Sequence, residues 1–145
     1  VRAYLQELEP GSVNRHSFAT ALAGLIGSLP TGEDVQIERR LDTATVELIP
    51  SHQVAEIMNI LREAVSNSLR HGRARHIVLR AGQNEQSIAL SVQDDGVGFV
   101  PRPGGGHGLP NMQARAAALG GSIAIESQPG KGTRVILMLP LPALA

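Results

Sequence analysis

The chain has 145 residues, 42% of them hydrophobic, which is enough for one globular core. Thirteen basic and thirteen acidic side chains cancel, so no net charge would attract a nucleic acid or an anionic membrane. The lack of cysteine excludes disulfides and thiolate metal sites, and no apolar run reaches the roughly 18 residues that span a bilayer. Because the first residue is Val1, we expect the chain to be a piece of a longer protein.

The first half of the chain predicts helices around a pair of short strands. Residues 1–9 predict the end of a helix that Pro10-Gly11 stops, and residues 17–28 predict a second short helix before Pro30. Residues 34–41 and 45–48 are candidate strands of an edge hairpin. From Ser51, which we assign as an N-cap, apolar residues recur at intervals of three and four. This pattern predicts a long amphipathic helix that ends at Gly72.

The second half predicts two hairpins separated by a loop and a helix. Residues 75–81 and 86–93 alternate as an antiparallel pair of strands, and residues 122–127 and 133–139 form a hairpin around Gln128-Pro129-Gly130-Lys131. Between them lie a loop over residues 94–108 and a helix over residues 109–119. This order predicts an α+β fold, a two-layer sandwich in which helices cover one face of a mixed, mostly antiparallel sheet. It disfavours a doubly wound fold.

The glycines gather between Gly96 and Gly108 and between Gly120 and Gly132, where backbone freedom matters most. Neither region contains a G-x-x-x-x-G-K-S/T loop or a G-x-G-x-x-G turn after a strand. Any nucleotide would therefore have to be held in another way.

Polar residues follow one stripe of the long predicted helix. Glu63, Asn67 and His71 are spaced four residues apart, with Arg70 beside them, and we expect the stripe to lie opposite the apolar face. An ordinary solvated surface would explain them. The set also suits a magnesium-bound polyphosphate, because Asn67 offers a neutral oxygen to the metal, Glu63 can orient water, and Arg70 and His71 can face phosphate oxygens.

A turn-like sequence, Asp94-Asp95-Gly96-Val97-Gly98-Phe99, follows an alternating strand. A plain loop is one interpretation. The other is a purine site, because an ionised Asp94 is an acceptor only, which suits the exocyclic amine of adenine and repels the carbonyl of guanine. Gly96 and Gly98 would let the backbone approach the flat base.

Two later glycine segments extend this pattern. Gly104-Gly105-Gly106-His107-Gly108-Leu109 is either a linker or a lid whose backbone N–H groups, entering a helix, hold phosphates. Gly130 and Lys131 are interpreted as a turn, whereas Thr133 begins a strand and can place its hydroxyl at the floor of a base pocket.

Taken in order, Asn67, the loop from Asp94 to Gly98, Gly106-His107-Gly108 and Gly132-Thr133 resemble the four boxes of the gyrase, chaperone, histidine kinase and mismatch-repair ATPase superfamily. The match covers residues 51–139. The segments REAVSNSLRHG, DDGVGF, GLPNMQARAAALGGSI and PGKGTRV look most like bacterial sensor histidine kinases of the nitrate-sensor type. In that subfamily, VRAYLQELEP is similar to the end of a dimerisation hairpin, so we assign residues 1–30 to the hairpin end and a connecting helix, and residues 31–145 to the ATP-binding catalytic domain.

The resemblance implies a Bergerat-type sandwich that holds ATP and Mg²⁺, with Asn67 on the metal, Asp94 on the adenine amine, and Gly106 and Gly108 near the phosphates. The same resemblance gives Glu63 a positioning role. It also implies a cytoplasmic location, in a parent protein with or without a membrane anchor.

A histidine followed by an acidic residue accepts the phosphate in these kinases. The five histidines here precede other residues: His16, His52, His71, His76 and His107 are followed by Ser, Gln, Gly, Ile and Gly. We therefore expect the fragment to bind ATP without phosphorylating itself. Its expected partners are the histidine-bearing dimerisation domain of a homodimeric parent and a response regulator. A serine kinase of the anti-sigma-factor type, or a nucleotide-responsive binding module without chemistry, remains an alternative.

Overall fold

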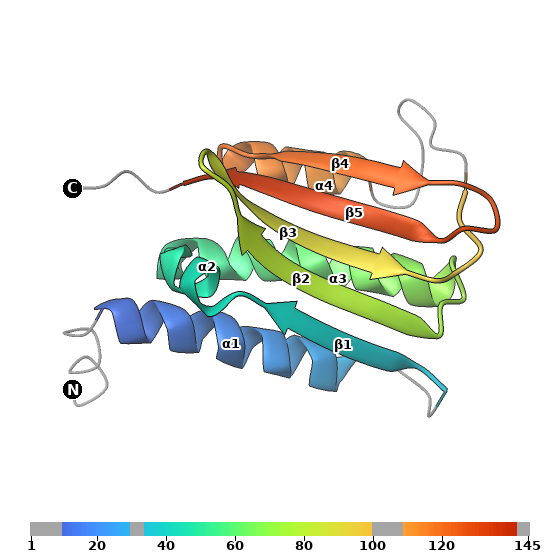
Figure 1. Cartoon of the computed structure of the whole chain (residues 1–145), viewed down its shortest axis with the longest axis horizontal. Coiled ribbons are helices and arrows are strands. Elements are labelled where there is room, and N and C mark those ends of the chain that lie inside the picture. The colour runs from blue at the N-terminus through green and yellow to red at the C-terminus, as the bar shows by residue number, and fades with distance from the viewer. Residues whose placement is uncertain (1–9, 30–33, 100–108, 142–145) are drawn as a thin grey trace.

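The structure is a computed structural model that describes residues 10–29, 34–99 and 109–141. The described residues form one five-stranded sheet in the order β1-β2-β3-β5-β4, together with helices that precede or connect the strands (Figure 1). The elements, in chain order, are α1 (Pro10–Ser28), β1 (Gln36–Leu41), α2 (Thr43–Leu48), the 3-10 helix η2 (Ser51–Gln53), α3 (Val54–Arg70), β2 (His76–Gln83), β3 (Ser87–Asp94), α4 (Leu109–Ala118), β4 (Ser122–Ser127) and β5 (Thr133–Pro140).

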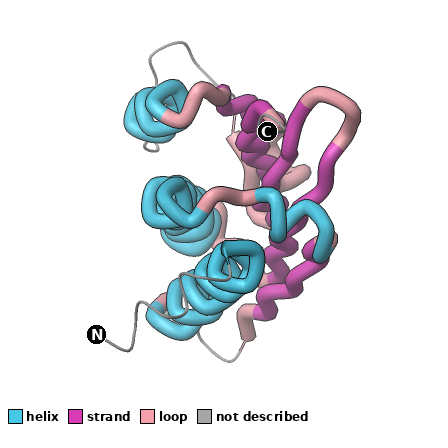
Figure 2. The backbone as a smooth tube through the Cα atoms, turned by 90° about the vertical axis from the view of Figure 1, so that its left-hand side faces the viewer, coloured by secondary structure: helices cyan, strands magenta, loops and turns pink. Residues whose placement is uncertain are grey.

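The three long helices α1, α3 and α4 form a layer along one face of the sheet (Figure 2). Strands β2 and β3, β3 and β5, and β4 and β5 pair antiparallel, whereas β1 pairs parallel with β2. This arrangement confirms the predicted two-layer α+β sandwich with a mixed, mostly antiparallel sheet.

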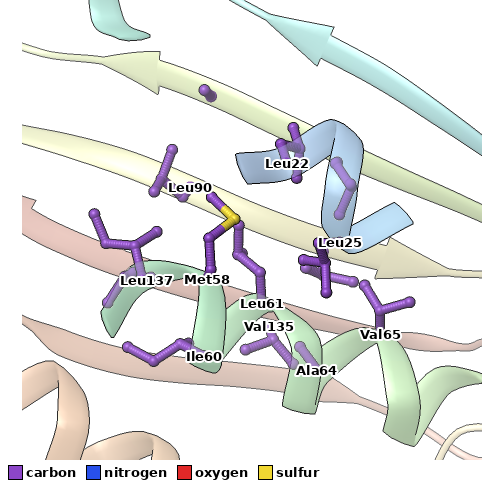
Figure 3. Packing of buried hydrophobic residues seen from close by; sticks show 14 of the residues in the cluster. Leu22, Leu25, Met58, Ile60, Leu61, Ala64, Val65, Leu90, Val135 and Leu137 are labelled. Carbon is purple, nitrogen blue, oxygen red and sulfur yellow. The ribbon is translucent and has the colours of Figure 1, made fainter. Parts of the chain in front are cut away.

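The core lies between these two layers. Helix α3 has a strongly amphipathic sequence and buries one face, including Ile57, Leu61 and Val65, against the sheet. Figure 3 shows Leu22 and Leu25 of α1 close to this face. Phe18, Leu22 and Leu25 are 1–2% exposed and belong to the same core cluster as the strands. The assignment of residues 1–30 to the end of a dimerisation hairpin stays a prediction.

The prediction of a strand at residues 45–48 is wrong. These residues belong to the short helix α2, which begins after Asp42. The Asp42 carboxylate accepts hydrogen bonds from the backbone N–H of Thr45 (3.1 Å) and from its hydroxyl (2.6 Å), as an N-cap does. This local cap outweighs the strand preference of the β-branched residues in TATVEL.

The predicted edge hairpin is wrong for the same reason. Strand β1 pairs in parallel with β2, from Gln36 opposite His76 to Leu41 opposite Ala81. A parallel pair needs a crossover connection, which α2, η2 and α3 supply. The Ser51 N-cap is also wrong, because Ser51 begins the 3-10 turn that leads into α3, and Gln53 is the capping residue of α3.

Within the described residues helix α1 spans Pro10–Ser28, so it is longer than the predicted residues 17–28. The predicted stop at Pro10-Gly11 is wrong, because both residues belong to this helix. The expected helix over residues 1–9 lies outside the described residues. In the part of the chain that the structure describes, no helix is long and apolar enough to cross a membrane.

Candidate functional site

Asp94 is the last residue of β3 and lies at the end of the sheet next to the final turn of α3. Its side chain is 6% exposed. One carboxylate oxygen, Oδ1, accepts hydrogen bonds from the backbone N–H groups of Gly96 (2.8 Å) and Thr133 (3.1 Å). The other oxygen, Oδ2, accepts a 2.5 Å hydrogen bond from the Ser68 hydroxyl on α3. Asp94 therefore joins the loop, β5 and α3 at a single buried point.

A pocket opens beside this carboxylate. Asn67, His71, Asp94 and Thr133 contribute polar groups to its wall together with Ser68. The rest of the lining is apolar or backbone: Ala64, Gly72, Gly98, Phe99, Met112, Ile125 and Val135. A narrow, mostly apolar pocket with one buried acceptor suits a flat heteroaromatic ring that carries an amine. The structure thus brings Asn67, His71, Asp94, Gly98 and Thr133 together, as the sequence predicted.

Asp95 has a different environment although it is the next residue. Its Oδ1 accepts hydrogen bonds from the backbone N–H groups of Arg75 (2.9 Å) and His76 (3.0 Å), and its side chain is exposed. The His76 and then the Arg75 N–H groups hold the pKa of the Asp95 carboxyl below its usual range. Asp95 therefore caps the start of β2, outside the pocket lining.

Close backbone contacts explain the glycines of this region. A Cβ at Gly96 would lie 2.3 Å from the carbonyl oxygen of Gly72, and one at Gly98 would lie 2.0 Å from that of Gln128. A Cβ at Gly132 would lie 2.1 Å from the Asp94 carbonyl oxygen, and φ is positive at both Gly98 (68°) and Gly132 (80°). These positions therefore need glycine for packing of the loop itself, a reason that the sequence analysis did not give.

Ser127 at the end of β4 fixes the floor of the pocket. Its hydroxyl oxygen accepts a hydrogen bond from the Phe99 N–H (2.8 Å) and lies 2.8 Å from the Thr133 hydroxyl. It also donates towards the Gly132 carbonyl oxygen (3.2 Å). The network connects the loop after β3 to the β4–β5 hairpin and holds Thr133 next to Asp94.

The polar stripe of α3 is placed differently from our expectation. Asn67 and His71 border the apolar face and line the pocket with Ala64 and Ser68, instead of lying opposite that face. A step of four residues turns a helix by about 40°, which brings the stripe round towards the buried side over two steps. Arg70 is exposed and is not part of the pocket lining.

Glu63 lies one turn before Asn67 and borders a second cavity between α3 and α4. The lining of this cavity, which we call the α3–α4 groove, consists of Asn59, Arg62, Glu63, Asn111, Met112 and Arg115. Met112 lines both the groove and the pocket, so the two cavities adjoin. An exposed ion pair between Arg115 and Glu56 joins the two helices beside the groove.

The remaining predicted residues belong to the segment before α4 and to the first residue of that helix. Gly106, His107 and Gly108 are outside the described residues, and Leu109 begins α4. Among the described residues, no cluster of three histidine or acidic side chains could hold a metal ion. The side-chain oxygen of Asn67 at the pocket wall suits Mg²⁺ that keeps most of its ligands as water and phosphate oxygens.

Sequence reasoning missed Ser68 and Ser127 and the apolar walls at Met112, Ile125 and Val135. A serine on the apolar face of α3 was the one available signal, because a buried hydroxyl needs a partner. Nothing in the sequence indicates that the partner is a residue 26 positions away.

The fold and this pocket define a nucleotide-binding domain, and comparison with known proteins identifies its family. Residues 52–143 match the family described as histidine kinase-, DNA gyrase B- and HSP90-like ATPases. The chain belongs to this family, and the resemblance drawn from the four sequence boxes is confirmed.

The relatives in sequence are sensor kinases. A sensor-like histidine kinase of Chloroflexus aurantiacus is 31% identical over 97% of this chain, and the nitrate/nitrite sensor protein NarX of Escherichia coli is 37% identical over 62% of it. The chain spans 25% and 15% of the lengths of these relatives.

Solved structures agree on the fold. The blue-light activated histidine kinase of Erythrobacter litoralis aligns with a TM-score of 0.70 at 23% identity, over 85% of this chain and 40% of that one. The ATP binding domain of PrrB from Mycobacterium tuberculosis aligns with a TM-score of 0.60 at 21% identity, over 89% and 94% of the two chains. The two-layer sandwich is therefore the fold of histidine kinase ATP-binding domains.

Proposed function

We propose that this chain binds magnesium ATP and passes the γ-phosphoryl group to a histidine on a separate dimerisation domain of a longer parent protein. The phosphoryl group would leave the β-phosphate oxygen of ATP and form a bond to an imidazole nitrogen, with ADP and a proton as the other products. A response regulator would then take the phosphoryl group on an aspartate. The parent would then be a homodimeric two-component kinase, with this chain on the cytoplasmic side of the membrane or in the cytoplasm.

The buried Asp94 carboxylate carries this proposal. An ionised carboxylate has about four acceptor positions, and donors from the described part of the chain fill three of those of Asp94. The remaining position suits the exocyclic amine of adenine, whereas the carbonyl oxygen of guanine would face a second acceptor. Phe99, Ile125 and Met112 of the pocket lining suit the faces and edge of the ring.

The triphosphate would extend from the pocket along α3 towards the start of α4. Asn67 would ligate Mg²⁺, which neutralises phosphate charge and orients the γ-phosphate when bound. His71 lines the pocket and can donate to the ribose or phosphates. The exposed Arg70, which precedes His71 at the end of α3, would face phosphate oxygens.

The lid side of the site completes this proposal. Gly106, His107 and Gly108 would give backbone N–H groups to the phosphates, and Leu109 begins the helix that follows them. Glu63, in the adjoining groove, would position the acceptor or a water. Phosphoryl transfer asks for this kind of positioning and charge neutralisation, so no strong nucleophile is needed in the chain.

Labelling of the parent protein with γ-labelled ATP tests the reaction. We expect a phosphoprotein whose label is lost in acid and kept in alkali, as phosphohistidine behaves. Addition of the isolated 145-residue chain to a parent protein with an Asp94→Asn change should restore labelling if the chain acts on a separate domain. Label that survives acid and is lost in alkali would indicate a serine kinase, and lack of any label would contradict the proposal.

A further inference from the structure

Ser68 is a buried hydroxyl on the otherwise apolar face of α3. It is 5% exposed and lies among Ala64, Val65 and Leu61 of the core cluster. Burial of an unpaired hydroxyl is unfavourable, so its partners indicate why this position carries one. In the described part of the chain, its two acceptors are the Ala64 carbonyl oxygen at 3.2 Å and Asp94 Oδ2 at 2.5 Å.

The hydroxyl has one proton, so the two acceptors compete for it. A distance of 2.5 Å is typical of a strong hydrogen bond from a hydroxyl to a carboxylate, whereas 3.2 Å is long for a neutral pair. The Ser68 hydroxyl therefore donates its hydrogen bond to the Asp94 carboxylate.

This hydrogen bond determines which acceptor position of Asp94 stays open. Oδ1 already receives two N–H groups, from Gly96 and Thr133. Among the described residues, Ser68 is the one donor to Oδ2, so the open position is on this oxygen. Because both oxygens accept hydrogen bonds, the carboxylate is fixed against rotation about the Cβ–Cγ bond of Asp94.

We infer that Ser68 is a positioning residue that sets the preference for a 6-amino purine by aiming the open acceptor position of Asp94 at the exocyclic amine. The inference rests on the proposed function and deepens it. Without the hydroxyl, Oδ2 gains a second open position and the carboxylate can turn or bind water. The free energy that the amine contributes then falls, while the stacking of the ring on the apolar walls is unaffected.

The test compares two nucleotides on the 145-residue chain by calorimetry: ATP and purine riboside triphosphate, which lacks only the 6-amino group. For the unaltered chain we expect ATP to bind at least about tenfold more tightly. Ser68→Ala should weaken ATP by about tenfold and leave the other nucleotide unchanged, so that the ratio approaches one. Ser91→Ala, which truncates another serine at 5% exposure, on β3 and outside the pocket lining, is the matched control and should keep the ratio.

Ser68→Cys gives the same test with nearly the same shape and a weaker donor, in case the alanine variant does not fold. Its ratio should fall between those of the serine and alanine forms. Equal weakening of both nucleotides, or an unchanged ratio, would overturn the inference about Ser68 while leaving ATP binding intact. A chain that binds neither nucleotide with Ser68 in place would overturn the proposed function and the inference with it.

Discussion

The pocket and the α3–α4 groove share Met112 in their linings, yet the floor of the pocket, around Asp94 and Thr133, is built differently from the groove. The floor is tied by three hydrogen bonds to the buried Asp94 carboxylate and by backbone contacts that leave no room for a side chain at Gly98 or Gly132. The groove is bordered by the exposed Arg115–Glu56 ion pair and by a 3.5 Å hydrogen bond from Arg62 to Asn59. Such exposed pairs contribute little to stability.

This comparison suggests that the two regions contribute to different parts of ligand binding. The chain itself fixes the group that we propose to recognise the base, so that recognition costs little reorganisation on binding. The side that we propose to face the phosphates carries exposed polar groups whose arrangement can respond to the ligand and metal. Substitutions in the floor should therefore act on folding or base selection, and substitutions towards the groove on phosphate and metal dependence.

The largest effect is expected from Gly132→Ala. The added Cβ would lie 2.1 Å from the Asp94 carbonyl oxygen at a φ of 80°, so both strain and a clash oppose it. We expect the free energy of unfolding in urea to fall by at least about 3 kcal/mol. Gly130→Ala is the matched control, because φ is again 80° but no atom lies within 4 Å of the new Cβ. It should cost about 1–2 kcal/mol, and equal losses would show that the close contact is unimportant.

Asp94→Asn should weaken ATP by about 100-fold in equilibrium dialysis, because the amide presents a donor where the adenine amine needs an acceptor. The neighbouring change Asp95→Asn is its control. The amide oxygen of that variant can still accept from the Arg75 and His76 N–H groups, so ATP affinity should stay within about twofold. If both variants lost ATP equally, the distinction between the two carboxylates would be wrong.

A smaller effect, on metal dependence, is expected towards the groove. Asn67→Ala should weaken ATP by about tenfold when Mg²⁺ is present and change the affinity little when it is chelated. Asn59→Ala, two turns earlier on α3 and bordering the groove, should leave the response to Mg²⁺ unchanged. If the Asn67 variant lost affinity without any change in its Mg²⁺ dependence, Asn67 would not be a ligand of the metal.

The smallest effect concerns pH. The pKa of Asp95 is held below its usual range by the His76 and Arg75 N–H groups, so its ionised form stabilises the folded chain. This stabilisation is complete above the ordinary aspartate pKa of about 3.9 and is lost as the pH falls through the lower folded value. The unfolding free energies of the unaltered chain and Asp95→Asn should therefore differ slightly at neutral pH and converge in acid. A difference that grows as the pH falls would contradict this account.

The sequence allowed prediction of the strands β2 to β5, the helices α3 and α4 and the sandwich, because their hydrophobic periods of two and three to four are long and regular. It misassigned α2, where Asp42 caps a helix over strand-forming residues, and consequently the pairing of β1. The Asp42 cap of α2 and the parallel pairing of β1 with β2 depend on contacts that cannot be predicted from the sequence of a short segment.

Within the site, Asn67, Asp94 and Thr133, which the ordered motifs singled out, line one pocket. Their roles in binding ATP stay a prediction. The motifs did not reveal the roles of Ser68 and Ser127: a serine on the apolar face of α3 indicates that a partner is needed, but the partner of each serine is known only from the folded structure. They also did not indicate that Gly96 packs against the Gly72 carbonyl.

Calorimetric titration of the 145-residue chain with magnesium ATP and magnesium GTP tests the central claim, that Asp94 and its partners form an adenine-specific site. The account predicts saturable binding of one ATP per chain and binding of GTP that is weaker by at least about 100-fold. Equal affinity for the two nucleotides would contradict the role given to Asp94, and failure of ATP to bind would contradict the proposed function itself.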